Sequence, residues 1–403
     1  MNRATSLLLN AAHTLDHLVL LVFASAITAI ANDFGIPRWE ELMPYTAGAF
    51  VMFGLGSIPA GRLGDLWGRR RMMLVFFFGI AMSCLAVALT RTPLQMAFAL
   101  TLLGSFASIY HPVGIPMLIR TAARPGVTIG WNNLAGNFGI AVAAFLTGFM
   151  VKAAGWRAAF LLPALLAVAL GLIFARVAPR ERQAPAVAAA SRPHSKPRRF
   201  AVRMLTVMTL SAITGSLLFN LTTNGNAELL RERFAAVTHD SALLGLLLAL
   251  VYGLAATSQV VVGLCIERVP MKPLFAGLAA AQVLFLALAA QTQGWVFYVC
   301  LLACMVAIFA VIPFGDIVVA RYVDDGMRSR VAGIRIAIAF GVGGLAVYLL
   351  GPVVKAAGFA VLLNTMALIA CVTVGAFLAL PAANLLEEPV ESAVAPEAKA
   401  KMV

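Results

Sequence analysis

Residues 61–71 read Gly-Arg-Leu-Gly-Asp-Leu-Trp-Gly-Arg-Arg-Arg and separate two long apolar stretches of the chain. Glycines at three positions of this segment permit a tight turn. Asp65 can accept hydrogen bonds from Arg69 or from the free N–H groups at the start of the next helix. Such an acidic latch holds two parts of a protein together in one conformation and releases them in another. We expect this gating loop to act through Gly61, Gly64, Asp65, Gly68, Arg69 and Arg70.

The apolar stretches continue on both sides of the loop and dominate the composition. The chain has 403 residues, of which 62% are hydrophobic and 12% are charged. Soluble domains are about half apolar and one quarter charged, so this surface needs a lipid bilayer. Twelve apolar runs of about 20–25 residues are each long enough to span one. The net charge of +13 lies in short runs between these stretches, which is typical of topology signals and argues against nucleic-acid binding.

The order of these runs predicts an all-α integral membrane protein with twelve transmembrane helices in two six-helix pseudo-repeats. Residues 1–177 form the first bundle and residues 203–380 the second. The basic, Pro-rich and Ala-rich segment 178–202 is a cytoplasmic linker, and the polar segment 381–403 is a cytoplasmic tail that we expect to be disordered.

A sequence repeat supports the two bundles. Val151-Lys152-Ala153-Ala154-Gly155-Trp156 recurs as Val354-Lys355-Ala356-Ala357-Gly358-Phe359 at an offset of 203. Parallel repeats are one architecture of secondary transporters, whose substrate site lies between the repeats near the midplane of the membrane. If the N-terminus lies in the cytoplasm, 22 of the 30 Lys and Arg residues lie on the cytoplasmic side of the membrane. This asymmetry predicts that both termini are cytoplasmic.

The loop at residues 61–71 resembles the signature loop of the major facilitator superfamily. A degraded copy lies at residues 263–272, where Glu267 and Arg268 take the gating positions. Two further segments, Ser108-Ile109-Tyr110-His111-Pro112 and Gly136-Asn137-Phe138-Gly139, resemble the fosmidomycin-resistance family of bacterial efflux carriers. This resemblance implies proton-coupled export of a small organic compound across the bacterial inner membrane.

Ionisable residues within membrane spans are costly and are functional candidates by default. His13, Asp16 and His17 lie on one helical face of the first span, and His111 lies in the fourth. The fosmidomycin-resistance family tends to carry His-x-x-x-Asp in the first span, whereas here His13 and His17 match these positions and Asp16 lies between them. In the superfamily fold the two spans are neighbours, so we expect a carboxylate beside an imidazole that carries a proton near neutral pH.

Other polar residues in the spans complete the candidate site. Asp316 and Arg335 lie at similar depth and are natural partners, either as a structural ion pair or in gating and anion binding. We expect the substrate cavity to be lined by Tyr110, Asn133, Asn137, Asn220 and Asn224.

These observations favour a proton-coupled exporter that works by alternating access, with protons, one small-molecule substrate and the bilayer as partners. The chain is expected to act as a monomer. An importer of an organic anion or metabolite, a transition-metal transporter, and a non-transporting receptor or assembly partner with the carrier fold stay open as alternatives. We find no catalytic constellation, no phosphate-binding glycine loop and no motif for a cofactor or resident metal, so no enzyme activity is predicted.

Overall fold

The structure is a computed structural model that describes residues 3–120, 122, 125–179, 198–266, 268–323 and 325–381. Every regular element in these ranges is helical. The elements are α1 (Arg3–Asp33), η1 (Trp39–Glu41), η2 (Met43–Thr46), α2 (Ala47–Leu55), α3 (Ser57–Trp67), α4 (Arg69–Ala88), α5 (Pro93–Ala107), η3 (Tyr110–Gly114), α6 (Ile115–Ile119), α7 (Pro125–Ala154), α8 (Trp156–Val177), α9 (Arg198–Arg233), α10 (Ser241–Cys265), α11 (Met271–Gln291), α12 (Gly294–Val311), α13 (Phe314–Tyr322) and α14 (Asp325–Leu378).

The described helices account for the twelve predicted spans. Ten are long and apolar enough to cross a membrane, and η1–α2 with α3 form an eleventh that is bent by 45°. The 54 residues of α14 hold two spans, because Gly358 at φ 76° and ψ 170° breaks the helical backbone. Gly155 between α7 and α8 has nearly the same backbone angles, φ 84° and ψ 168°. The repeated Ala-Ala-Gly-aromatic segment therefore makes the same turn in both halves, where a positive φ favours glycine.

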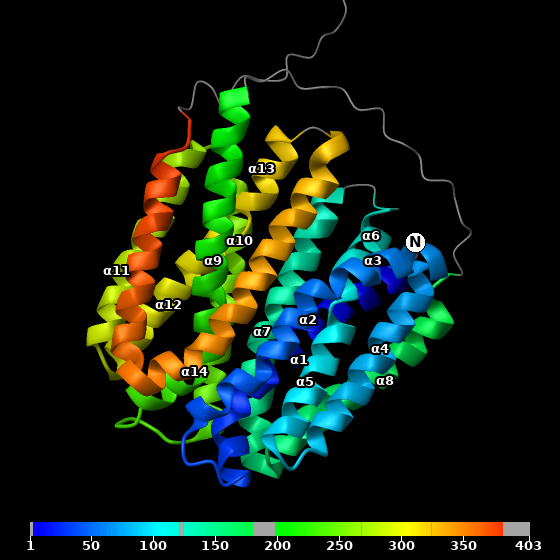
Figure 1. The fold of residues 1–403 in the computed structure, drawn as a ribbon, viewed down its shortest axis with the longest axis vertical. Helices are drawn as coiled ribbons and strands as arrows, with labels where there is room; N and C mark the ends of the chain where they lie inside the picture. Colours follow the sequence, from blue (N-terminus) through cyan, green and yellow to red (C-terminus); the bar gives the residue numbers. More distant parts are fainter. Residues whose placement is uncertain are drawn as a thin grey trace, which may run out of the picture.

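The two halves stand side by side in Figure 1, with α1–α8 on one side and α9–α14 on the other. The end of α8 and the start of α9, which flank the basic segment, lie at the same end of the bundle as the N-terminus (Figure 1). We call this the linker end, and the opposite end, where α7 is followed by α8 and where α14 bends, the far end. Helix α9 begins five residues before the predicted start of the second half at residue 203. Residues 180–197 of the predicted linker and residues 382–403 of the predicted tail lie outside the described residues.

Contacts between the halves gather toward the far end. Lys152 of α7 pairs with Asp240 at the start of α10, and Lys355 of α14 lies 2.7 Å from Glu41 of η1. Gly148 of α7 and Gly245 of α10 approach so closely that a Cβ on Gly148 would lie 3.0 Å from the Gly245 Cα. Small residues at such crossings let helix backbones pack closely in a membrane. The far end is therefore closed in this conformation.

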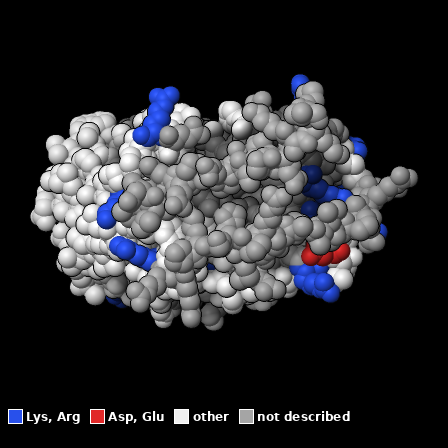
Figure 2. Space-filling model, turned by 90° about the horizontal axis from the view of Figure 1, so that it is seen from above, with Lys and Arg blue, Asp and Glu red and all other residues white. Residues whose placement is uncertain are grey.

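Figure 2 looks onto the linker end, where the described charged side chains are mostly Lys and Arg. Arg70 and Arg203 bind backbone carbonyls at the ends of α8 and α14. Cations stabilise helix C-termini because the last carbonyl groups lack partners within the helix. These basic residues thus complete helix ends as well as marking one face of the bundle.

Candidate functional site

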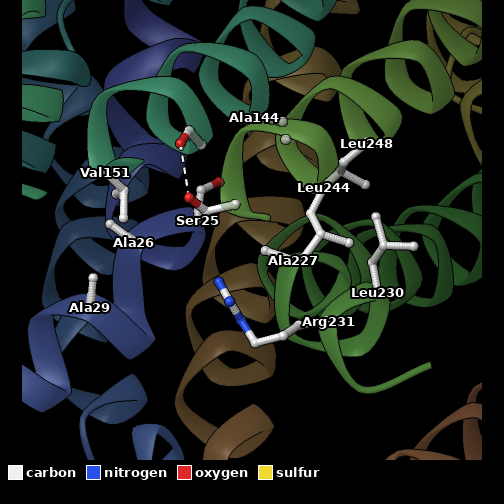
Figure 3. A pocket seen from close by; sticks show the side chains of 13 residues that line it. Ser25, Ala26, Ala29, Ala144, Val151, Ala227, Leu230, Arg231, Leu244 and Leu248 are labelled. Atoms are coloured by element: carbon white, nitrogen blue, oxygen red, sulfur yellow. Dashed lines mark hydrogen bonds between the residues drawn. The ribbon is translucent and has the colours of Figure 1, made fainter. Parts of the chain in front are cut away.

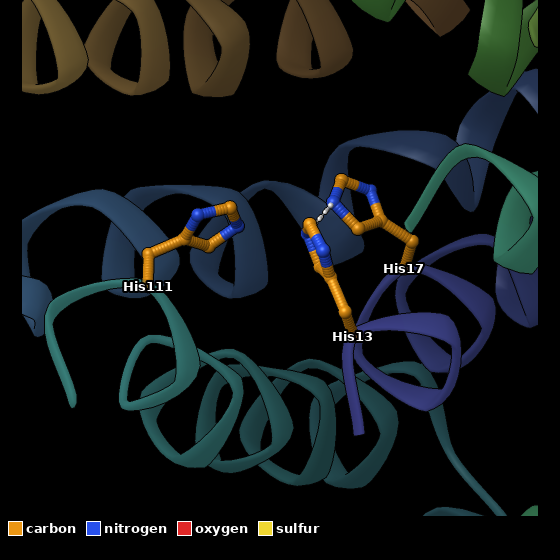
Figure 4. A group of neighbouring side chains, drawn as sticks. All are labelled: His13, His17 and His111. Carbon is orange, nitrogen blue, oxygen red and sulfur yellow. Dashed lines mark hydrogen bonds between the residues drawn. The ribbon is translucent and has the colours of Figure 1, made fainter. Parts of the chain in front are cut away.

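The ionisable groups predicted to lie within the first and fourth spans converge in the first half. The Nε2 atoms of His13 and His17 on α1 are 3.1 Å apart. One ring nitrogen from each of His13, His17 and His111 lies within 4.8 Å of the others. Figure 4 shows the three rings turned toward one another from α1 and η3. The predicted proximity of the first and fourth spans is confirmed at this cluster.

Asp16 lies beside the cluster and is fully buried. Its Oδ2 is 3.7 Å from His111 Nε2, which is an ion-pair distance when the imidazole is protonated. Neither carboxylate oxygen has a hydrogen-bond partner among the described residues. A buried carboxylate without hydrogen bonds is costly, and either a proton on it or a cation next to it removes that cost. Asp16 and His111 can therefore share one proton, which is bound either to the carboxylate or to the imidazole.

His111 is positioned by a π-helical turn, η3, which has Pro112 near its centre. Proline has no backbone N–H, so the regular α-helical ladder is interrupted there. Single π-helical turns inside α-helices occur frequently at functional sites. The turn is covered by α3, since a Cβ on Gly61 would lie 3.3 Å from Pro112 and a Cβ on Gly64 would lie 3.0 Å from Val113.

Tyr110 and Asn132 both contact His13 and fix its position. The Tyr110 ring stacks on His13 with centroids 4.7 Å apart, and its hydroxyl donates to the Leu9 carbonyl at 2.9 Å. The Asn132 amide donates to the Tyr110 hydroxyl at 2.6 Å and to Asn10 Oδ1 at 2.9 Å. Tyr110 is itself buried. It thus supports the histidine cluster, and the prediction that it lines the substrate cavity stays a prediction.

The backbone of Asn132 fixes the tautomer of His13. His13 Nδ1 lies 2.7 Å from the Asn132 carbonyl oxygen. A carbonyl only accepts, so Nδ1 carries the proton in this bond and Nε2 of the neutral ring is an acceptor that faces His17. Helix α7 reaches His13 because position 136 is glycine, where a Cβ would lie 2.6 Å from the imidazole ring. This close approach explains glycine at position 136.

An aromatic contact from the second half closes over His111. Phe53 on α2 and Phe340 on α14 have ring centroids 4.6 Å apart, and both rings lie within 6.0 Å of the His111 ring. Gly54 permits this approach, since a Cβ there would lie 2.7 Å from the Phe340 Cβ. Phe340 therefore links the candidate site directly to the opposite half.

The gating loop departs in part from its prediction. Gly68 alone makes the tight turn, with φ 90°, whereas Gly61 and Gly64 lie within α3 and serve close packing. Asp65 and Arg69 form an ion pair at 4.0 Å across the turn. Arg70 donates to the Ala175 and Ala178 carbonyls of the same half. That these residues latch the two halves stays a prediction. Glu267 of the second copy lies outside the described residues, and Arg268 closes a turn with the Cys265 carbonyl.

The remaining predicted residues are separate from the histidine cluster. Asp316 and Arg335 are an ion pair, as expected from their depth. The Asn220 and Asn224 amides donate to carbonyls one turn earlier on α9, at 2.9 and 3.0 Å. On α7, Asn133 is partly buried and Asn137 is buried. That the four asparagines line a substrate cavity is a prediction still.

Sequence reasoning missed several residues of the site. Asn10 lies one turn before the first-span histidines, so helical spacing was the available signal for it, whereas Asn132 belongs with Asn133 and Asn137 to a polar stripe that the sequence shows in the fifth span. Phe53 and Phe340 carry no such signal, because phenylalanine occurs in most spans of this chain. Glu228 on α9, for which the sequence left both the mouth of the cavity and a loop open, is buried with 4% exposure.

The fold and the site define a polytopic membrane protein with paired six-helix halves and buried titratable groups. A family profile described as Major Facilitator Superfamily matches residues 9–348. The chain therefore belongs to the major facilitator superfamily, which is a family of transporters.

Curated relatives match a smaller part of the chain. The probable actinorhodin transporter of Streptomyces coelicolor is 29% identical over 168 residues, covering 40% of this chain and 28% of that protein. The tetracenomycin C resistance and export protein of Streptomyces glaucescens is 29% identical over 176 residues, covering 41% and 32%. The alignments thus span less than a third of the length of these relatives.

Solved structures match the whole fold. The crystal structure of a D-xylose–proton symporter superimposes with a TM-score of 0.74 and 16% identity, over 93% of this chain and 96% of that one. At this identity the likeness shows the fold alone. It agrees with a helical carrier of about twelve spans.

Proposed function

We propose that this carrier is a proton-coupled exporter of a small organic compound in the bacterial inner membrane, with both termini and the linker end in the cytoplasm. The observation that carries the proposal is the contact of the buried Asp16 carboxylate with His111 at 3.7 Å. The carrier acts as a monomer, and its two halves rock about a central site.

The coupling follows from the chemistry of this pair. When the proton is on Asp16, the carboxyl group is neutral and His111 is free of an ionic partner. When the proton is on His111, the two groups form a buried ion pair. Phe340 of the second half packs within 6.0 Å of the His111 ring, so a change of charge there acts on the contact between halves. A carrier whose two states hold the proton differently converts a proton gradient into a bias between them.

Export is the direction that the resemblance to the fosmidomycin-resistance family favours. One curated relative is described as a resistance and export protein, while the D-xylose–proton symporter shares only the fold. Import of an organic anion through Arg335 is disfavoured because that guanidinium pairs with Asp316. A non-transporting receptor is disfavoured by the intact Asp65–Arg69 ion pair of the gating loop.

The test begins with a panel of toxic organic compounds given to a sensitive strain with and without the expressed chain. A compound to which the chain confers resistance is then added to everted vesicles, where proton-driven export alkalinises the lumen. We expect Asp16→Asn to abolish this response. Asp33→Asn on the same helix, whose side chain is 42% exposed and paired with Arg157, should retain it. Unchanged transport by Asp16→Asn would refute the role of Asp16.

A second candidate function is transition-metal transport, because three imidazoles lie within 4.8 Å of one another. Histidines that bind metal usually donate their other ring N–H to a carbonyl or carboxylate, as His13 does to Asn132. Nitrogens around a tetrahedral ion lie about 3.3 Å apart, so the cluster must contract slightly. Titration of the purified protein with Co²⁺, read by its visible absorption, separates the two functions. Binding that is lost in His17→Ala but kept in His239→Ala supports metal transport, and no binding refutes it.

A further inference from the structure

A second buried carboxylate lies on the other half of the molecule, away from Asp16. Glu228 is on α9, the first helix of the second half, and its side chain is 4% exposed. Its Oε2 is 3.2 Å from Arg231 Nε one turn later. Its Oε1 makes no hydrogen bond of normal geometry with a described residue. Intramembrane carboxylates of this kind are costly to keep for packing alone.

Glu228 faces the seam between the halves. Its polar neighbour across the seam is Thr28 of α1. Asp16 lies twelve residues earlier on α1, which corresponds to about 18 Å along the helix. The two carboxylates thus occupy different levels of the bundle, with Asp16 nearer the linker end and Glu228 at the far end.

Arg231 connects Glu228 to a cavity in this seam. The cavity has an empty volume of about 440 Å³, including open solvent, and is formed by α1, α7, α9 and α10. Figure 3 shows the Arg231 guanidinium pointing into it from α9, opposite Ser25 and Ala26 of α1. Much of its lining is Ala, Gly and Ser, which leaves space around the guanidinium group.

The seam is closed beside this cavity. Ser241 Oγ donates to the Gly148 carbonyl at 3.2 Å, and Lys152 pairs with Asp240. In the conformation described here, the cavity wall is held together by contacts from both halves. We expect separation of α7 from α10 to widen the cavity and expose the Glu228 carboxylate, which is 4% exposed in the closed state.

We propose that Glu228 is the group that takes up the proton from the extracellular side, and that Arg231 is its counter-ion while the far end is closed. Protonation neutralises Glu228, which weakens its interaction with Thr28 of α1 across the seam and favours the open seam. Loss of the proton restores this interaction and favours closure. The inference rests on the proposed function for the direction in which protons move.

Few other charges act on this carboxylate. Among the described residues, Arg231 is the formal charge whose field acts on Glu228. At the mouth of the seam, the pKa of Asp240 is lowered from its usual value because Lys152 donates a hydrogen bond to it. Asp240 therefore stays ionised above about pH 4.

The experiment measures opening of the seam without any transported compound. Ala26 lines the cavity and is 2% exposed, so Ala26→Cys reacts with a charged thiol reagent only when the seam opens. The purified full chain in lipid nanodiscs is labelled with a methanethiosulfonate cation, and labelling of the chain that lacks this cysteine is subtracted. We expect the labelling rate to rise about tenfold as pH falls from 8 to 5, the factor that corresponds to 1.4 kcal/mol of coupling.

Variants assign the pH response. Glu228→Gln should label rapidly at every pH, and Glu228→Asp should restore the pH response. Glu232→Gln removes a carboxylate one turn later that is 55% exposed, and it should behave like the parent. If Glu228→Gln does not fold, Arg231→Gln breaks the same pair and should also label rapidly at high pH. A parent rate that does not change with pH, or a pH response that persists in Glu228→Gln or Arg231→Gln, would overturn the inference.

The outcome is distinguishable from failure of the proposed function. Labelling requires neither transport nor Asp16. If Asp16→Asn still exports its compound while the seam responds to pH through Glu228, the proposed role of Asp16 fails and this inference stands. If Asp16→Asn loses export and the pH response of the seam does not depend on Glu228, only this inference fails.

Discussion

The Gly148–Gly245 contact predicts that one added methyl group shifts the balance between conformations. A Cβ on Gly148 would lie 2.4 Å from the Ser241 carbonyl oxygen and 3.0 Å from the Gly245 Cα. Ordinary contacts begin near 3.4 Å, so α7 and α10 must separate by about 1 Å, and overpacking of this kind costs about 1–3 kcal/mol. The closed state bears this cost and the open state does not. Gly148→Ala should therefore raise the open population about 5-fold to 150-fold.

The assay for this prediction is labelling of Ala26→Cys at a fixed pH of about 8, where we expect Glu228 to be ionised and the seam to be closed. The matched control is Gly253→Ala, because Gly253 lies on α10 and a Cβ there meets nothing within 4 Å. The control should label like the parent. A Gly148→Ala chain that is folded and labels no faster than the control would refute the reasoning that this contact holds the far end closed.

Three further predictions follow from other contacts. Tyr110→Phe removes the hydroxyl between the Leu9 carbonyl and the Asn132 amide, so it should lower the free energy of unfolding by about 1–3 kcal/mol; Tyr348→Phe, at a residue with 51% exposure, should leave the unfolding midpoint in detergent unchanged. Gly68→Ala forces a side chain into φ 90° and should cost about 1–3 kcal/mol by the same measurement, whereas Gly277→Ala, where a Cβ meets nothing within 4 Å, should cost nothing. Because hydrogen bonding from Lys152 lowers the pKa of Asp240, this pair should support the closed seam above about pH 4 and lose that contribution as pH falls further. The labelling rate of the Glu228→Asp chain should therefore rise a second time at strongly acid pH, where Asp240 becomes protonated and its pair with Lys152 is lost. Asp240→Asn should abolish this second rise.

Composition, length and the internal repeat were sufficient to predict the class and the layout of this protein. Apolar runs long enough to cross a bilayer have no other stable environment, so twelve spans follow from composition and length. The repeated Ala-Ala-Gly-aromatic segment predicted equivalent turns, and Gly155 and Gly358 have matching backbone angles. The pairing of Asp316 with Arg335 also followed, because two opposite charges at one depth in a membrane stabilise each other.

Which side chains of different helices come into contact depends on how the helices pack. Spacing placed His13 and His17 on one helical face, but their contact with His111 depends on how α1 packs against η3. That packing depends on Gly136, Asn132 and a π-helical turn, none of which periodicity specifies. Gly61 and Gly64 are a second example. A glycine that permits a turn and a glycine that permits close packing cannot be distinguished in the sequence. Distances across the bundle arise from side-chain packing between helices far apart in the chain, so the histidine cluster and the Glu228 seam became visible only in the folded protein.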